Sequence, residues 1–183
     1  MSTLGPITRQ IQCDGAEVLI RPIRAEDEKR YAEFFTRVSP EDIRLRFFAP
    51  MKDFSRAFIA RMTRPDPRHA MAFIALDAQT GEMLGVVRLH LHPDGETGEY
   101  AIIVRSDLKG KGLGWHLMQT IIDYARGRDL RSIEGQVLRG NTTMLDMCRE
   151  LGFALRPDPR DPGIVSVRLD LQAKPDTKPA RLV

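Results

Sequence analysis

A glycine-rich segment, KGKGLG at residues 109–114, constrains the fold of this chain more than any other feature. It follows EYAIIV at residues 99–104, which has the length and residue types of a β-strand, and it precedes a stretch with helical periodicity. A turn between a strand and a helix exposes backbone N–H groups where the helix begins. Those donors and the helix dipole favour an anion, above all a phosphate. The segment therefore predicts a phosphate-binding loop.

The spacing of the glycines argues against two other kinds of phosphate-binding loop. It lacks the GxxxxGK[ST] pattern of a P-loop. It also lacks the third glycine of a dinucleotide-binding fingerprint. Glu134 does lie about 20 residues beyond Gly114, as that fingerprint requires, but it does not end its predicted strand, and the neighbouring strands are expected to be antiparallel. The remaining alternative is an ordinary strand-to-helix connection whose glycines only permit a tight turn.

The rest of the chain changes between strand and helix periodicity in a regular order. Turn signals at residues 77–81 and 92–95 join three central strands, so these are expected to form an antiparallel meander. The predicted strands are residues 18–23, 70–76, 83–91, 99–104, 132–138 and 164–171. The predicted helices are residues 25–38, 39–48, 54–62, 112–126 and 141–151, the second of which begins with Ser39 as its N-cap and Pro40 in its first turn.

The length of 183 residues suits one domain with short tails. Hydrophobic residues make up 42% of the chain and charged residues 29%, which permits a buried core. We expect an N-terminal arm or short hairpin at residues 1–16 and a folded domain at residues 17–171. Residues 172–183 are polar and contain proline, so we expect a disordered C-terminal tail.

Charge and hydropathy exclude several classes of function. The net charge of +3 suits a phosphorylated ligand, but no basic stripe with interleaved aromatic residues predicts nucleic-acid binding. No apolar run approaches the roughly 20 residues of a membrane span, and no signal peptide is recognisable, so we expect a cytoplasmic protein.

Neither a disulfide framework nor a metal site is predicted. Cys13 and Cys148 are the two cysteines, and they form no CxxC pair. His90 and His92 lie two residues apart on a predicted strand, but no third ligand accompanies them.

The glycine segment resembles the acyl-CoA pyrophosphate loop of the GNAT superfamily of N-acetyltransferases. Lys109, Gly112 and Gly114 match the family pattern Arg/Gln-x-x-Gly-x-Gly/Ala, with Lys in place of Arg or Gln. Residues 141–153, NTTMLDMCRELGF, resemble the second family signature, an Asn that opens a helix ending in Gly-Phe. The resemblance covers residues 17–171. It implies an α/β (α+β) GNAT-like fold, with a central mixed, mostly antiparallel sheet flanked by helices.

Further segments are similar to the acetyltransferase domain of bacterial protein lysine acetyltransferases. They are DG at residues 14–15, IRPI at 20–23, ED at 26–27, RFF at 46–48, GEYA at 98–101 and RSDLKG at 105–110. Those enzymes often carry the domain fused to a large regulatory domain. This chain is too short to hold one, so we expect the catalytic domain alone.

The resemblance implies acetyl-CoA as the acetyl donor and assigns site residues. Glu99 stands where these enzymes carry the general base that deprotonates the acceptor amine; burial of such a base near the thioester would raise its pKa towards the working pH. The strand that carries Ile102, Ile103 and Val104 is expected to splay from its neighbour at a bulge, so that its backbone binds the pantetheine arm and polarises the thioester carbonyl. The other cofactor-binding positions are Lys109, Gly110, Lys111, Gly112, Leu113, Gly114 and Trp115 at the pyrophosphate, and Asn141 at the cofactor arm.

Two other regions of the resemblance concern the leaving thiol and the acceptor. Cys148 stands where many relatives have a Tyr that protonates the thiolate; we expect Cys148 to be a small core residue and assign no general acid. The segment with Arg44, Arg46, Phe47 and Phe48 walls the acceptor site in this fold. Those four residues either select the substrate or pack as an amphipathic helix.

The sequence thus predicts direct transfer of an acetyl group from acetyl-CoA to an amine, without a covalent enzyme intermediate and without a metal. The preferred acceptor is a protein lysine, and the alternative within this chemistry is a small-molecule amine. A catalytically idle acyl-CoA-binding module that regulates a partner is the third interpretation. The missing Tyr favours that module, and Glu99 argues against it.

Overall fold

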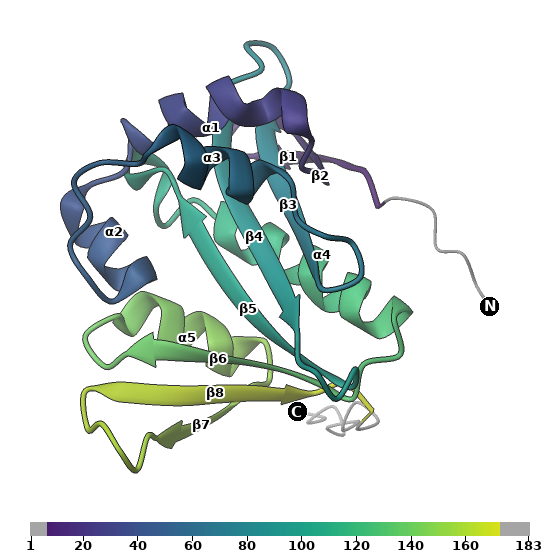
Figure 1. Ribbon diagram of the computed structural model, residues 1–183, viewed down its shortest axis with the longest axis vertical. Coiled ribbons are helices and arrows are strands. Elements are labelled where there is room, and N and C mark those ends of the chain that lie inside the picture. The colour runs from purple at the N-terminus through teal and green to yellow at the C-terminus, as the bar shows by residue number, and fades with distance from the viewer. Residues whose placement is uncertain (1–6, 173–183) are drawn as a thin grey trace, which may run out of the picture.

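The computed structural model describes residues 7–172 and contains one sheet of eight strands in the order β1-β2-β3-β4-β5-β6-β8-β7 (Figure 1). Neighbouring strands run antiparallel except β5 and β6, which are parallel. This confirms the predicted mixed, mostly antiparallel sheet and its central meander. The strands are β1 (Arg9–Cys13), β2 (Ala16–Pro22), β3 (Ala70–Asp77), β4 (Met83–Leu91), β5 (Thr97–Val104), β6 (Ser132–Leu138), β7 (Ala154–Pro157) and β8 (Ile164–Asp170).

Helices cover both faces of the sheet. They are α1 (Glu28–Phe35), α2 (Pro40–Phe47), α3 (Arg56–Thr63), α4 (Leu113–Gly127) and α5 (Thr142–Glu150), with short 3-10 helices η1 (Ala25–Asp27) and η2 (Ser106–Leu108). Helices α1 and α3 lie on one face, and α4 lies on the other (Figure 1). Ser39 caps α2 as predicted, because its hydroxyl accepts a hydrogen bond from the Asp42 N–H.

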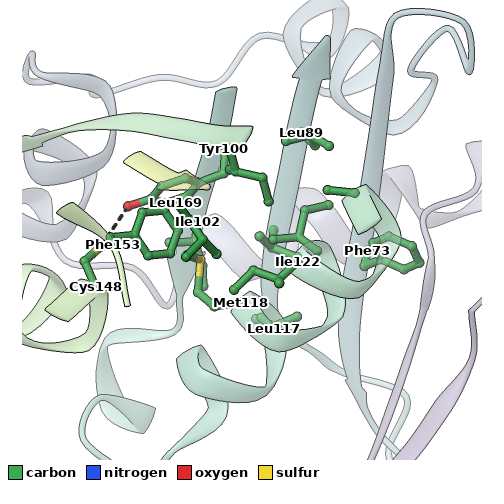
Figure 2. Packing of buried hydrophobic residues seen from close by; sticks show 14 of the residues in the cluster. Phe73, Leu89, Tyr100, Ile102, Leu117, Met118, Ile122, Cys148, Phe153 and Leu169 are labelled. Carbon is green, nitrogen blue, oxygen red and sulfur yellow. Dashed lines mark hydrogen bonds between the residues drawn. The ribbon is translucent and has the colours of Figure 1, made fainter. Parts of the chain in front are cut away.

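Two apolar cores follow from this arrangement, one on each face of the sheet. Side chains alternate between the faces of a strand, so Val86 packs with α1 and α3 while Val87 packs with α4. The α4 core includes Leu117, Met118 and Ile121, which are fully buried (Figure 2). Strand β5 contributes to both cores and therefore lies at the centre of the molecule.

A buried ion pair connects β2 to the start of α1. Both terminal nitrogens of Arg21 lie 2.8 Å from the carboxylate oxygens of Asp27, and the Arg24 N–H donates to the same carboxylate at 2.8 Å. Arg30 adds a contact at 3.3 Å. Asp27 is only 1% exposed, so its charge depends on these partners.

The structure corrects the predicted elements at the margins of the sheet. Of the arm or short hairpin expected at residues 1–16, the hairpin is present: β1 pairs antiparallel with β2 across residues 14–15, so the sheet begins before residue 17. The four-residue strand β7 was not predicted, because it is short and ends in Pro157. The predicted tail lies outside the described residues except for Gln172. Within residues 7–172, no helix combines the length and apolar character that a membrane span requires.

Candidate active site

Strands β5 and β6 separate after three residue pairs, and this opening organises the site. They pair at Thr97–Ser132, Gly98–Ile133 and Glu99–Glu134, and then diverge as a V with α2 and α5 on either side (Figure 1). The predicted splay is therefore present. The predicted bulge is not, because the register between β4 and β5 keeps one offset from Gly98 to Val104.

A tyrosine lies directly after the last residue of β5 that pairs with β6. A Cβ atom added at Gly135 of β6 would lie 2.6 Å from Cε1 of Tyr100, so the ring occupies the space where β6 would otherwise carry a side chain. The ring also packs edge-on against Phe153, with centroids 5.7 Å apart. Tyr100 was not among the site residues predicted from the sequence. The available signal was the glycine inside a strand, which marks a close approach.

The Tyr100 hydroxyl lies 3.2 Å from Sγ of Cys148, as Figure 2 shows. Cys148 is fully buried, as predicted for a small core residue. Burial, together with the neighbouring Cys148, raises the pKa of Tyr100, so its hydroxyl stays protonated. Many relatives carry a Tyr at this position of α5. In this chain the position holds Cys148, whose thiol contacts Tyr100 of β5.

We expect Gly135→Ala to lower the free energy of unfolding by about 1–3 kcal/mol, because the new methyl group overpacks the Tyr100 ring. Urea unfolding measures this change. Gly140→Ala is the matched control, since a Cβ there meets nothing within 4 Å, and we expect a change within about 0.5 kcal/mol. Equal stability of the two variants would contradict the close packing of the Tyr100 ring against Gly135.

A cavity of about 850 Å³ fills the opening, a size typical of small-molecule sites. Residues of α2, β5, the glycine loop, α4, β6 and α5 line it. The structure thus brings nearly all predicted site residues to one cavity: Glu99, Ile102, Ile103, Val104, Lys109, Gly110, Gly112, Leu113, Gly114, Trp115 and Asn141. Asn141 also caps α5, where its side-chain oxygen accepts from the Met144 N–H at 3.3 Å.

The glycine loop presents free backbone donors to this cavity. Gly110 and Gly112 have φ of +76° and +89°, and a Cβ on either would meet nothing within 4 Å. The first hydrogen bond of α4 runs from the His116 N–H to the Gly112 carbonyl, so the N–H groups before His116 have no partner within the helix. The first turn of α4 contains no acidic side chain. These donors at the positive end of a 15-residue helix suit a diphosphate.

The two loop lysines have separate roles in the structure. Nζ of Lys109 lies 2.5 Å from Asp42 of α2, which also accepts from Ser106 at 2.5 Å. Burial of Asp42 raises its pKa, but the hydrogen bonds from Lys109 and Ser106 outweigh burial and hold it below its ordinary value. Lys109 is thus both a lining residue and a link between α2 and the loop.

Lys111 is the one predicted cofactor-binding residue that does not line the cavity. Its Nζ lies 2.8 Å from Asp14 in the β1–β2 turn, and its carbonyl accepts from the Cys13 thiol at 3.2 Å. The side chain therefore connects the loop to the β1–β2 hairpin.

Glu99 lies on the face of β5 opposite Tyr100, beside its cross-strand partner His90. Its side chain is exposed, so burial does not desolvate this carboxylate in the structure. Glu99 lines the main cavity and also a second hollow of about 660 Å³ over β6, β8 and β7. A molecule entering from either side can therefore reach this carboxylate.

Three of the four residues expected near the acceptor line the cavity. They are Arg46, Phe47 and Phe48, whereas Arg44 points to Glu41 at 2.6 Å. His92 lies 3.4 Å from Glu134, and residues 7–172 contain no cluster of three or more His, Cys, Asp or Glu side chains arranged to hold a metal.

Comparisons with known proteins agree with this geometry. A model of the acetyltransferase (GNAT) family matches residues 28–153. An acetyltransferase of Pseudomonas aeruginosa is 36% identical over 160 residues, which is 86% of each chain. The L-methionine sulfoximine/L-methionine sulfone acetyltransferase of the same species is 37% identical over 59 residues, covering 32% of this chain and 34% of that one. The GNAT domain of S. lividans PAT superposes with a TM-score of 0.81 at 26% identity, covering 89% of this chain and 96% of that chain.

Proposed function

This chain belongs to the acetyltransferase (GNAT) family and is an acyl-CoA-dependent N-acetyltransferase, and on that premise we propose that Glu99 is the general base toward a primary amine. One observation carries the proposal: a single cavity contacts both Glu99 and the free N–H groups of the glycine loop. A cofactor with its phosphates at the loop and its arm along β5 brings its thioester toward Glu99.

The proposed reaction has one proton transfer before the bond changes. Glu99 accepts a proton from the ammonium group of the acceptor, directly or through one water, because only a neutral amine is a nucleophile. The amine nitrogen forms a bond to the thioester carbonyl carbon, while β5 backbone N–H groups stabilise the negative charge on its oxygen. The carbon–sulfur bond then breaks with its electron pair on sulfur. The extra proton on the newly bonded nitrogen passes to the departing thiolate, directly or through water, so the products are a neutral amide and CoA as a thiol. Glu99 returns its own proton to solvent.

Two classes of acceptor have support. Sequence resemblance to protein lysine acetyltransferases and the structural likeness to S. lividans PAT favour a protein lysine. A relative named for acetylating methionine sulfoximine and methionine sulfone favours a small amine. We propose the small amine first, because the cavity wall next to Glu99 contains Arg46, whose half-buried charge suits a small anionic acceptor.

A fractionated cell lysate tests whether the enzyme acetylates small amines in preference to protein lysines. Protein and low-mass fractions are incubated separately with labelled acetyl-CoA and the enzyme, and thiol release and labelled products are measured. We expect label on amines of the low-mass fraction. Label confined to lysines of the protein fraction would reverse the order, and absence of thiol release from both fractions would contradict amine acetylation.

A further inference from the structure

We propose that Arg46 forms an anion subsite for the acceptor, so that the amine this enzyme acetylates carries a carboxylate close to its amino group, as an α-amino acid does. The inference rests on the proposed function, because it places the acceptor amine at Glu99. It adds a binding role for a side chain that the acetyl-transfer chemistry does not use.

Arg46 and Arg88 form no ion pair with an acidic side chain among the described residues. The other buried or half-buried arginines all form ion pairs: Arg9 with Asp123, Arg21 and Arg30 with Asp27, and Arg105 with Asp107 and Glu82. Arg88 is 4% exposed, and its one hydrogen bond goes to the Met62 carbonyl at 2.5 Å. Arg46 makes no hydrogen bond and no ion pair within residues 7–172. Buried charges are normally paired, so this pair of guanidinium groups requires an explanation.

The position of Arg46 also suits an acceptor subsite. Arg46 lies in the last turn of α2, lines the same cavity as Glu99, and packs with its guanidinium carbon 4.6 Å from the centre of the Phe47 ring. Burial lowers the pKa of Arg46, and Arg88 lowers it further, while Tyr31 and Glu99 act in the opposite direction. These groups therefore lie close enough to interact electrostatically.

The charges around the proposed position of the acceptor amine also favour an acceptor that carries a carboxylate. Burial, Arg88 and Arg46 lower the pKa of His90 despite the opposing effect of Glu99, so His90 is neutral near pH 7. Two guanidinium groups then face one carboxylate. An ammonium group entering alone adds a third positive charge, whereas an amino acid brings a carboxylate with it.

A carboxylate also matches the planar shape of the unpaired Arg46 guanidinium. A guanidinium binds a carboxylate through two parallel hydrogen bonds, which fixes orientation as well as charge. With the carboxylate at Arg46, the amino group of the same molecule is directed to Glu99. A lysine side chain within a protein has no carboxylate of its own at this spacing, so the subsite distinguishes the two acceptor classes.

The test compares L-α-amino acids with their carboxamides and their decarboxylated amines in a thiol-release assay with acetyl-CoA. For the parent we expect kcat/KM for the best acid to exceed that for its amide by about ten- to a hundredfold, the usual effect of a charged hydrogen-bonded pair. Arg46→Met should lower kcat/KM for the acid to the level of the amide, and Arg46→Lys should retain part of the preference.

Arg44→Met is the matched control, because Arg44 lies on the same helix, is exposed and pairs with Glu41. It should keep the full preference. Thermal unfolding of each variant verifies that it is folded. Equal kcat/KM for acid and amide in the parent, or an equal loss for both in Arg46→Met, would overturn the inference.

Calorimetry with the CoA-bound protein separates this inference from the proposed function, since it requires no acetyl transfer. Each panel amino acid and its amide are titrated into the parent and Arg46→Met. We expect acid binding that Arg46→Met weakens by about tenfold or more. If no amine releases thiol but this binding is seen, amine acetylation fails and the anion subsite stands. If amides are acetylated and bound as well as acids, the subsite fails and the acetyltransferase stands.

Discussion

Glu99→Gln is expected to lower kcat by about 10²–10⁴, the usual contribution of a general base. Gln keeps the size and hydrogen-bonding capacity of the side chain but cannot accept the proton of the acceptor ammonium. The glycine loop and the β5 backbone are unchanged, so affinity for CoA should stay the same. Thiol release with a saturating amine measures the first quantity, and calorimetry with CoA measures the second.

Glu134→Gln is the matched control for this experiment. Glu134 is the β6 residue that pairs with Glu99, but it does not line the main cavity, and its carboxylate contacts His92 and Arg168. We expect kcat within a factor of about three of the parent, since surface polar changes have small effects. A Glu99→Gln enzyme as active as this control would remove Glu99 from the mechanism.

Asp27→Ala is expected to lower the free energy of unfolding by about 3–5 kcal/mol, because it leaves the buried Arg21 guanidinium without its carboxylate. Urea unfolding at pH 7 measures the loss. Glu26→Ala is the control, since Glu26 is the exposed neighbour, and its removal should change the free energy by about 0.5 kcal/mol or less. Similar values for the two variants would show that the ion pair contributes nothing.

The same pair predicts a dependence on pH. Burial raises the pKa of Asp27, but the hydrogen bonds from Arg21 and the Arg24 N–H outweigh burial and hold it below its ordinary value. A carboxyl with a depressed pKa stabilises the fold fully above its unfolded pKa of about 4, and this contribution is lost as pH falls through the folded pKa. The difference between parent and Asp27→Ala should therefore shrink below about pH 4. A difference that stayed constant to pH 2 would contradict this linkage.

Local sequence patterns predicted the parts of the site that depend on local structure. The glycines of residues 110–114 require a turn wherever they occur, and the following apolar stripe requires a helix, so the loop and α4 followed from neighbouring residues. Strand β6 has the predicted bounds, Ser132–Leu138, because β-branched and apolar residues alternate there between clear turn signals. Glu99 was assigned as the base only through the family resemblance, which places a Glu on the strand before the loop, and its role stays a prediction.

Contacts between distant segments could not be predicted in this way. The space for Tyr100 depends on Gly135, which lies on another strand, and no periodicity in either segment reports that contact. The partner of Lys111 is Asp14, almost a hundred residues earlier. Each of these features is set by tertiary packing, and each decides what the site contacts.

The separation of β5 from β6 also has a consequence for association between molecules. An unpaired strand edge offers backbone donors and acceptors to any extended chain, and proteins usually protect such edges at the margins of their sheets. Here an unpaired edge of β5 lies in the middle of the sheet, beyond its three pairs with β6, with α2 and α5 on either side (Figure 1). This free edge is thus flanked by other elements of the same chain, whereas an edge at the margin of a sheet faces solvent.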